Sequence, residues 1–192
     1  MKITKIETYR LDYKTSHFHT DRPLAFQASY GTYTGSQHVI VKIHTDRGIT
    51  GIGEAANSVI SAPGRTHLRP KETSDTVIHM IRDFIAPNIV GDDPLEIGKI
   101  HYKMDAWICG HKSAKAAVDM ALYDIMGHSY ETPICKLLGG CYRKDIPCLA
   151  AIGIEEPEEM AKEALSWVEK GWIGFQMKIG GLAVKPEKDV ER

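Results

Sequence analysis

"DIPCLAAIGIEEPEEMAKEALSWVEKGWIGFQMKIGG", from Asp145 to Gly181, is the stretch that decides the fold class. Short apolar runs stand at its two ends, in "IPCLAAIG" and "IGFQMKIG". The segment between them begins with acidic residues and ends on a glycine, a pattern typical of a helix. A strand, a helix and a second strand in this order predict a right-handed βαβ unit with two parallel strands. The following "PEKDVER" predicts the start of another helix.

Two parallel strands cannot form a complete sheet of this class, because helices must bury both faces of such a sheet. A (β/α) barrel takes about 250 residues, whereas fewer than 50 residues follow Asp145. We therefore expect an incomplete barrel and a chain that is the front part of a longer protein. The alternative is a self-contained α+β domain with a short βαβ appendage.

The residues before this unit predict an antiparallel sheet. Strict alternation in "KITKIETYRL" predicts one strand, and "HVIVKIHTDRGITGIGEA" predicts two more strands joined by a tight turn that ends at Gly48. The long segment from Tyr13 to Ser36 is expected to be a functional loop or disordered. "NSVISAPGRTHLRP" is expected to be a second irregular stretch.

Three helices are predicted after the sheet. The first spans Lys71 to Ile85, and the second spans Pro94 to Trp107 with a start signal at Asp93-Pro94. The third lies in "SAKAAVDMALYDIMGHS", where small apolar residues recur at helical spacing and permit close approach to a neighbouring element. Its predicted buried residues are Ala114, Ala117, Val118, Ala121, Leu122 and Ile125.

Composition excludes several classes of protein. The chain has 24 Lys and Arg against 25 Asp and Glu, so it has no strong field for nucleic acid or an anionic membrane surface. No window approaches the roughly 18 apolar residues of a membrane span, and the N-terminus lacks the apolar core of a signal peptide. A cytoplasmic location is therefore expected. The four cysteines show no CxxC spacing and are expected to be reduced thiols: Cys109, Cys135, Cys141 and Cys148.

Three segments in this order carry a resemblance to a known family: "VIVKIHTDRGITGIGEA", "AKAAVDMALYDIMGHSYETPICKLLGG" and a strand that ends in "FQMKIGG". Together they resemble the mandelate racemase and muconate lactonizing enzyme branch of the enolase superfamily. The resemblance implies an α+β capping domain over residues 1–130 and the first part of a modified (β/α) barrel over residues 131–192. It also implies that acidic Mg²⁺ ligands come from later barrel strands, downstream of Arg192, with no metal ligand in this chain.

The same resemblance places the acid/base lysine of a Lys-x-Lys motif at Lys178, with Gln176 in place of the first lysine. The residues themselves agree, since alternation puts both side chains on one face and catalytic groups project from the carboxyl ends of barrel strands. A lysine can act as a base there only where burial, a metal or a nearby cation favours the neutral amine. Gln176 cannot supply that cation. The alternative is a lysine that extends to solvent from a strand end.

The chemistry implied by the resemblance is Mg²⁺-dependent removal of a proton alpha to a carboxylate through an enolate. The outcome would be racemisation, epimerisation or dehydration of a small carboxylate, an amino-acid or proline derivative as in hydroxyproline-betaine epimerases and hydroxyproline dehydratases. A sugar-acid dehydratase, a cycloisomerase and a binding protein that retains the fold stay open. A small-molecule carboxylate is the implied partner, and the full-length protein is expected to be a homo-oligomer.

The two irregular stretches are expected to fold over the barrel mouth and to choose the substrate. Two histidines in a polar loop, His17 and His19, are more often solvated than metal-bound. A plain hydrophobic anchor explains two aromatic candidates equally well. The candidate substrate-binding residues, besides Gln176, are His19, Phe26, Tyr30 and Asn57.

Overall fold

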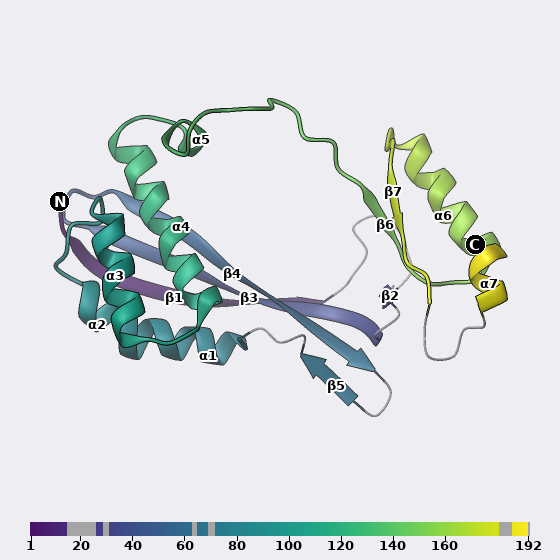
Figure 1. The fold of residues 1–192 in the computed structure, drawn as a ribbon, viewed down its shortest axis with the longest axis horizontal. Coiled ribbons are helices and arrows are strands. Elements are labelled where there is room, and N and C mark those ends of the chain that lie inside the picture. Colours follow the sequence, from purple (N-terminus) through teal and green to yellow (C-terminus); the bar gives the residue numbers. More distant parts are fainter. Residues whose placement is uncertain (15–25, 29–30, 63–64, 69–71, 181–185, 192) are drawn as a thin grey trace. The chain divides into compact units, whose positions relative to one another are not determined.

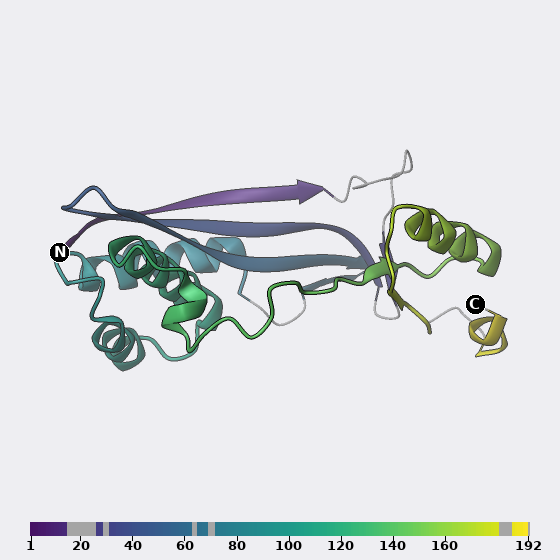
Figure 2. The same cartoon turned by 90° about the horizontal axis from the view of Figure 1, so that it is seen from above.

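The computed structural model describes residues 1–14, 26–28, 31–62, 65–68, 72–180 and 186–191. Its contacts divide the chain into two compact units, whose elements are drawn in Figures 1 and 2. Unit 1 comprises Met1–Tyr13, Ser36–Ser58 and Pro70–Tyr142, and unit 2 comprises Lys14–Gly35, Val59–Arg69 and Arg143–Arg192.

The first sheet contains the three predicted strands and two further ones, in the order β1-β3-β4-β5 with β2 paired to β3. The backbone N–H of Asp46 donates to the carbonyl of Lys2 at 2.9 Å, and farther along β1 the side chain of Glu7 is hydrogen-bonded to that of His44. Because the partner's number falls as the number along β1 rises, β1 and β3 run antiparallel. The predicted turn is present, because the backbone N–H of Gly48, at φ 75°, donates to the carbonyl of Thr45 across 3.2 Å. The strands are β1 (Ile3–Lys14), β2 (Phe26–Ala28), β3 (Gly31–Thr45), β4 (Thr50–Ala62) and β5 (Arg65–Leu68).

Strand structure extends into both stretches that the sequence predicts to be irregular, so that prediction was wrong in part. In unit 2, β2 pairs antiparallel with the start of β3, and β5 pairs antiparallel with the end of β4. These segments are rich in polar residues, as in "GTYTGSQ" and "RTHL". Because the strand signal in a sequence is the alternation of apolar and polar residues, paired strands without that alternation are missed.

The helices of unit 1 lie on one face of the sheet, as the two views show. The predicted first helix begins at Ser74, passes through a π-helical segment (η1) that ends at Ile85, and continues beyond Ile85 as α2. The predicted start at Pro94 was wrong, because Asp93 accepts a hydrogen bond from the Leu95 N–H at 3.0 Å and forms a turn before α3 begins. The helices are α1 (Ser74–His79), η1 (Met80–Ile85), α2 (Ala86–Ile89), α3 (Ile97–Trp107), α4 (Lys112–Ser129) and α5 (Ile134–Leu137).

Helix α4 forms the centre of the core of unit 1, as its small residues predict. All six residues predicted to be buried on α4 are 0% exposed. Gly51 and Gly53 on β4 face the backbone of α4 so closely that a Cβ at either position would overlap a carbonyl oxygen of the helix. The absence of a side chain at these two glycines therefore allows α4 to lie this close to the sheet.

Unit 2 contains the predicted βαβ unit, formed by β6 (Ala150–Ile152), α6 (Pro157–Glu169) and β7 (Phe175–Met177), followed by α7 (Pro186–Glu191). β6 and β7 are parallel, which confirms the prediction. The part of the chain that the structure describes contains no closed barrel, as expected from the two-stranded second sheet. All four cysteines are exposed, and none of the four forms a disulfide, which agrees with the prediction of reduced thiols. Within the described ranges, no helix has the length and apolar character needed to cross a membrane.

Candidate functional site

The β6–β7 pair has one face covered by a helix and one face open. On β6, Ala150 and Ile152 are 4% and 1% exposed, on the side where α6 packs against the strand. Ala151 lies between them and is exposed. Ala151 pairs with Gln176 in the register of the two strands, so both side chains point away from α6. The open face of the pair, called the open face below, thus carries a methyl group on β6 and polar residues on β7.

Lys178 and Gln176 lie together on the open face. Lys178 Nζ donates a hydrogen bond to Gln176 Oε1 across 2.8 Å, which confirms the prediction that alternation puts both side chains on one face. The backbone N–H of Lys178 donates to the Ile152 carbonyl at 3.0 Å and extends the parallel ladder one residue beyond β7. The lysine is half-buried and the glutamine is exposed. Lys178 therefore stands at the carboxyl end of β7 on a hydrogen-bonded backbone.

Side chains from α7 hold the segments that follow the two strands. Gly180 turns the chain at φ 79°, and its N–H donates to Asp189 Oδ2 across 2.9 Å. Lys188 Nζ pairs with Glu156 Oε2 at 2.6 Å, in an exposed contact worth about 0–1 kcal/mol. The sequence analysis did not predict these two contacts. The only sequence signal for them is the charged pair Lys188 and Asp189 in the short helix α7.

Aromatic contacts fix the opposite end of the unit, where α6 leads into β7. Trp167 and Trp172 pack edge to face with centroids 5.4 Å apart, and Lys170 Nζ lies 4.9 Å above the Trp167 ring. Trp167 Nε1 donates to Glu163 Oε1 at 3.3 Å. Burial raises the pKa of Glu163 above its ordinary value, although the Trp167 hydrogen bond opposes that shift. These contacts hold the segment that leads into β7.

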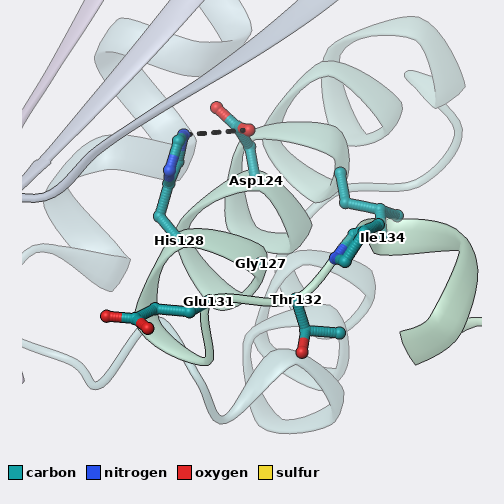
Figure 3. A pocket seen from close by; sticks show the side chains of 7 residues that line it. Asp124, Gly127, His128, Glu131, Thr132 and Ile134 are labelled. Atoms are coloured by element: carbon teal, nitrogen blue, oxygen red, sulfur yellow. Dashed lines mark ion pairs between the residues drawn. The ribbon is translucent and has the colours of Figure 1, made fainter.

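Unit 1 has a shallow pocket where α4 ends and α5 begins (Figure 3). His128 Nε2 lies 3.6 Å from Asp124 Oδ1, and the other oxygen of Asp124 accepts from the Ile52 N–H at 2.9 Å. Glu131 and Thr132 point away from this pair. Because the polar groups do not converge, the pocket offers no arrangement for catalysis.

No group of three or more His, Cys, Asp or Glu side chains that could hold a metal ion occurs within the residues described here. The expectation of metal ligands downstream of Arg192 stays a prediction. His19 and Tyr30 lie outside the described residues. Phe26 and Asn57 belong to β2 and β4 by their backbone, but their side chains lie outside what the structure describes. The predicted substrate-binding roles of these four residues therefore remain predictions.

Comparison with known proteins extends over the whole chain. Residues 12–139 match the N-terminal domain of the mandelate racemase / muconate lactonizing enzyme family. An N-succinyl-L-Arg/Lys racemase of Bacillus cereus is 35% identical over 192 residues, which are 100% of this chain and 48% of the relative. A crystal structure of N-succinyl Arg/Lys racemase from Bacillus cereus matches with a TM-score of 0.81 over 100% of this chain and 47% of that chain.

Two further matches differ in the reaction that they are named for. A cis-3-hydroxy-L-proline dehydratase of Roseibium aggregatum is 33% identical over 95% of this chain and 46% of its own length. A dipeptide epimerase from Enterococcus faecalis, crystallised with Mg and the dipeptide L-Leu-L-Tyr, is 29% identical, with a TM-score of 0.81 over 100% of this chain and 49% of that chain. Other relatives are epimerases and chloromuconate cycloisomerases. The chain spans about half the length of the curated relatives it matches.

Proposed function

Because the chain belongs to the mandelate racemase / muconate lactonizing enzyme family, we propose that the full-length protein removes a proton alpha to a carboxylate and forms an enolate. The enolate is then reprotonated, in racemisation or epimerisation, or loses a β-hydroxyl group, in dehydration. The observation that carries the proposal is Lys178, which stands at the carboxyl end of a parallel strand and on its open face. Barrel enzymes place their catalytic groups at this end of the strands.

Lys178 is the proposed acid/base catalyst for one face of the substrate. A neutral amine takes the α-proton with its lone pair, and the C–H bonding electrons remain on the substrate as the enolate. The resulting ammonium returns the proton in the reverse step. Inversion needs a second group on the opposite face of the substrate, which we do not assign to any residue of this chain.

The proposed substrate is an amino-acid or proline derivative. Support comes from relatives named for N-succinyl-Arg/Lys, for L-Ala-D/L-Glu, for cis-3-hydroxy-L-proline and for dipeptides. All these substrates contain a carboxylate. In each of them an α-nitrogen is substituted: it is acylated in the N-succinyl amino acids and the dipeptides, and it is part of the ring in hydroxyproline. Cycloisomerisation is a second candidate, favoured by the 32% identity to chloromuconate cycloisomerases over 192 residues.

Mg²⁺ is the proposed cofactor of the full-length protein, because the matched Enterococcus faecalis structure contains Mg. Such an ion would neutralise the charge that develops on the carboxylate oxygens. The described residues do not form a site for it.

Solvent exchange tests the function directly. The full-length protein is incubated in D₂O with N-succinyl amino acids, dipeptides and hydroxyprolines, and the α-proton signal is followed by NMR. Lys178→Ala should lower the rate of exchange by about 10² to 10⁴ for the enantiomer that presents its proton to Lys178. The loss should appear in kcat more than in KM, because the lysine acts in the transition state.

The matched control is Lys162→Ala, which removes an exposed lysine of α6 in the same βαβ unit. It should retain exchange at the parent rate. Equal exchange of both enantiomers by the parent protein and by Lys178→Ala would remove Lys178 from the mechanism. Turnover of muconates without α-proton exchange of amino-acid derivatives would favour the cycloisomerase, and no turnover of either class would favour a binding protein.

A further inference from the structure

Four large apolar side chains of unit 1 are exposed around one groove, called the α4–α5 groove below. The groove has a volume of about 490 Å³ and is lined by residues of β4, α4 and α5. Leu138 and Ile52 are 63% and 53% exposed, and Met120 and Ile134 are 43% and 36% exposed. Single apolar side chains are normal on a protein surface, whereas several that line one concave surface mark an interaction site.

The core of unit 1 is formed without these four side chains. Within the described residues, none of the four belongs to the buried core or to the partly buried apolar side chains that pack against it. Transfer of apolar surface out of water is the main favourable contribution to association. The four side chains would therefore gain their burial from a contact with an element outside unit 1.

Two carboxylates line the same groove. Asp119 Oδ1 lies 2.6 Å from His101 Nε2. Asp124 Oδ2 accepts from the Ile52 N–H at 2.9 Å, and Asp124 Oδ1 lies 3.6 Å from His128 Nε2. Each carboxylate keeps further lone pairs for a donor, and no lysine or arginine is among the described residues that line the groove. The groove thus fits an occupant that presents an aliphatic side chain next to a basic one.

The groove does not complement itself. In a two-fold symmetric contact the same surface of both copies meets, so Asp119 and Asp124 of one copy would face the same carboxylates of the other. Juxtaposition of like charges in an interface is costly. The charge of the groove therefore argues against a second copy of the groove as its occupant.

The chain leaves unit 1 shortly after the groove, since α5 ends at Leu137 and unit 1 ends at Tyr142. This chain covers 48% of the N-succinyl-L-Arg/Lys racemase and 49% of the dipeptide epimerase structure. About half of each of these relatives is thus polypeptide that has no counterpart in the 192 residues. A full-length protein of similar length can supply the occupant from its own chain.

We propose that the α4–α5 groove is the docking site for a segment of the full-length protein from beyond Arg192. This segment places an aliphatic side chain among the four apolar residues and a lysine or arginine at Asp119 and Asp124. The inference goes beyond the proposed function and does not depend on the reaction at Lys178.

The test is photocrosslinking of the full-length protein with the substitution Leu138→p-benzoylphenylalanine. Denaturing electrophoresis separates crosslinks within one chain from crosslinks between two chains, which double the mass, and mass spectrometry identifies the joined peptides. The expected product has the mass of one chain and joins position 138 to a peptide from beyond Arg192 that contains a lysine or arginine. The matched control is Tyr102→p-benzoylphenylalanine on α3, because Tyr102 is 76% exposed and lies outside the lining of the groove. The control should not give this product.

Thermal unfolding of the full-length protein gives a second readout. Leu138→Ala should lower Tm by at least about 2–4 °C, as truncation of a leucine that is buried in a contact does. Tyr102→Ala should leave Tm unchanged, because substitutions on an open surface have little effect.

Three results would overturn the inference. A crosslinked product of doubled mass would assign the groove to a second copy, and capture of a different protein would assign it to a separate partner. Crosslinks only to residues of β4, α4 and α5, together with an unchanged Tm in Leu138→Ala, would mean that the groove is open to solvent in the full-length protein.

Discussion

Gly53→Ala tests how β4 and α4 determine the stability of unit 1. A Cβ at this position would overlap the carbonyl oxygen of Ala117 and would lie 2.9 Å from both the Ala117 carbonyl carbon and the Ala121 nitrogen. Carbon atoms in proteins pack at about 3.5–4.0 Å. All three atoms belong to the helix backbone, so no side chain can rotate away to make room.

The magnitude follows from what must move. Overpacking of a core costs typically about 1–3 kcal/mol, and a rigid helix backbone places this site at the upper end of that range. Moving α4 away from the sheet would also loosen fully buried residues on α4 and on the neighbouring strand β3, including Leu122, Val39 and Val41. At roughly 2–4 °C per kcal/mol for a domain of about 150–250 residues, a cost of about 3 kcal/mol lowers Tm by about 6–12 °C.

The assay is thermal unfolding of the full-length protein by calorimetry, with Gly98→Ala as the matched control. Gly98 lies in the first turn of α3, and a Cβ there meets nothing within 4 Å. The same chemical change should stabilise the protein by up to about 1 kcal/mol at that site, because alanine favours a helix over glycine. The two variants should therefore shift Tm in opposite directions. A Gly53→Ala protein that unfolds at or above the parent Tm would refute the close approach of strand and helix.

Two further predictions concern contacts outside the open face. Glu72 is largely buried and accepts from the Ser113 N–H at 2.8 Å at the start of α4, so Glu72→Ala should lower the free energy of unfolding in urea by about 0.5–2 kcal/mol, as loss of a helix cap does. Glu72→Gln, which keeps an acceptor oxygen, should lose less, and equal losses would argue against capping. Burial raises the pKa of Glu163, so the folded state binds its proton more tightly than the unfolded state, and the carboxyl destabilises the protein as pH rises above its ordinary pKa. Glu163→Gln should therefore gain stability relative to the parent between pH 4 and pH 7 in urea titrations, and a pH-independent difference would contradict this sign.

Much of the site could be predicted because it depends on local periodicity. A period of two places Gln176 and Lys178 on one side of β7, and the hydrogen bond between them confirms it. The order strand, helix, strand predicts a parallel pair, because a helical crossover returns the chain in the same direction. The small residues of α4 likewise predict that another element packs closely against this helix. That element is β4, whose Gly51 and Gly53 lie against the backbone of α4.

The errors occurred where local signals are weak. The pairing of β2 with β3 and of β5 with β4 connects polar segments whose backbones satisfy one another without an alternating apolar pattern. Asp93-Pro94 has the residue types of a helix start, yet the Asp93 side chain caps a turn and α3 starts at Ile97. A sequence pattern cannot distinguish these cases, since the same residues favour turns and helix N-termini.

By itself, the sequence determined the two fold classes in the chain, the core face of α4, the parallel βαβ unit and the shared side of Gln176 and Lys178. All of these follow from the spacing of side chains along a helix or strand. Only the tertiary structure decided which groups meet across the chain: the amide oxygen of Gln176 at Lys178, Asp189 at Gly180, and the β4 glycines at the backbone of α4. Such contacts depend on rotamers and on distances between elements far apart in sequence, and periodicity along the chain does not specify either.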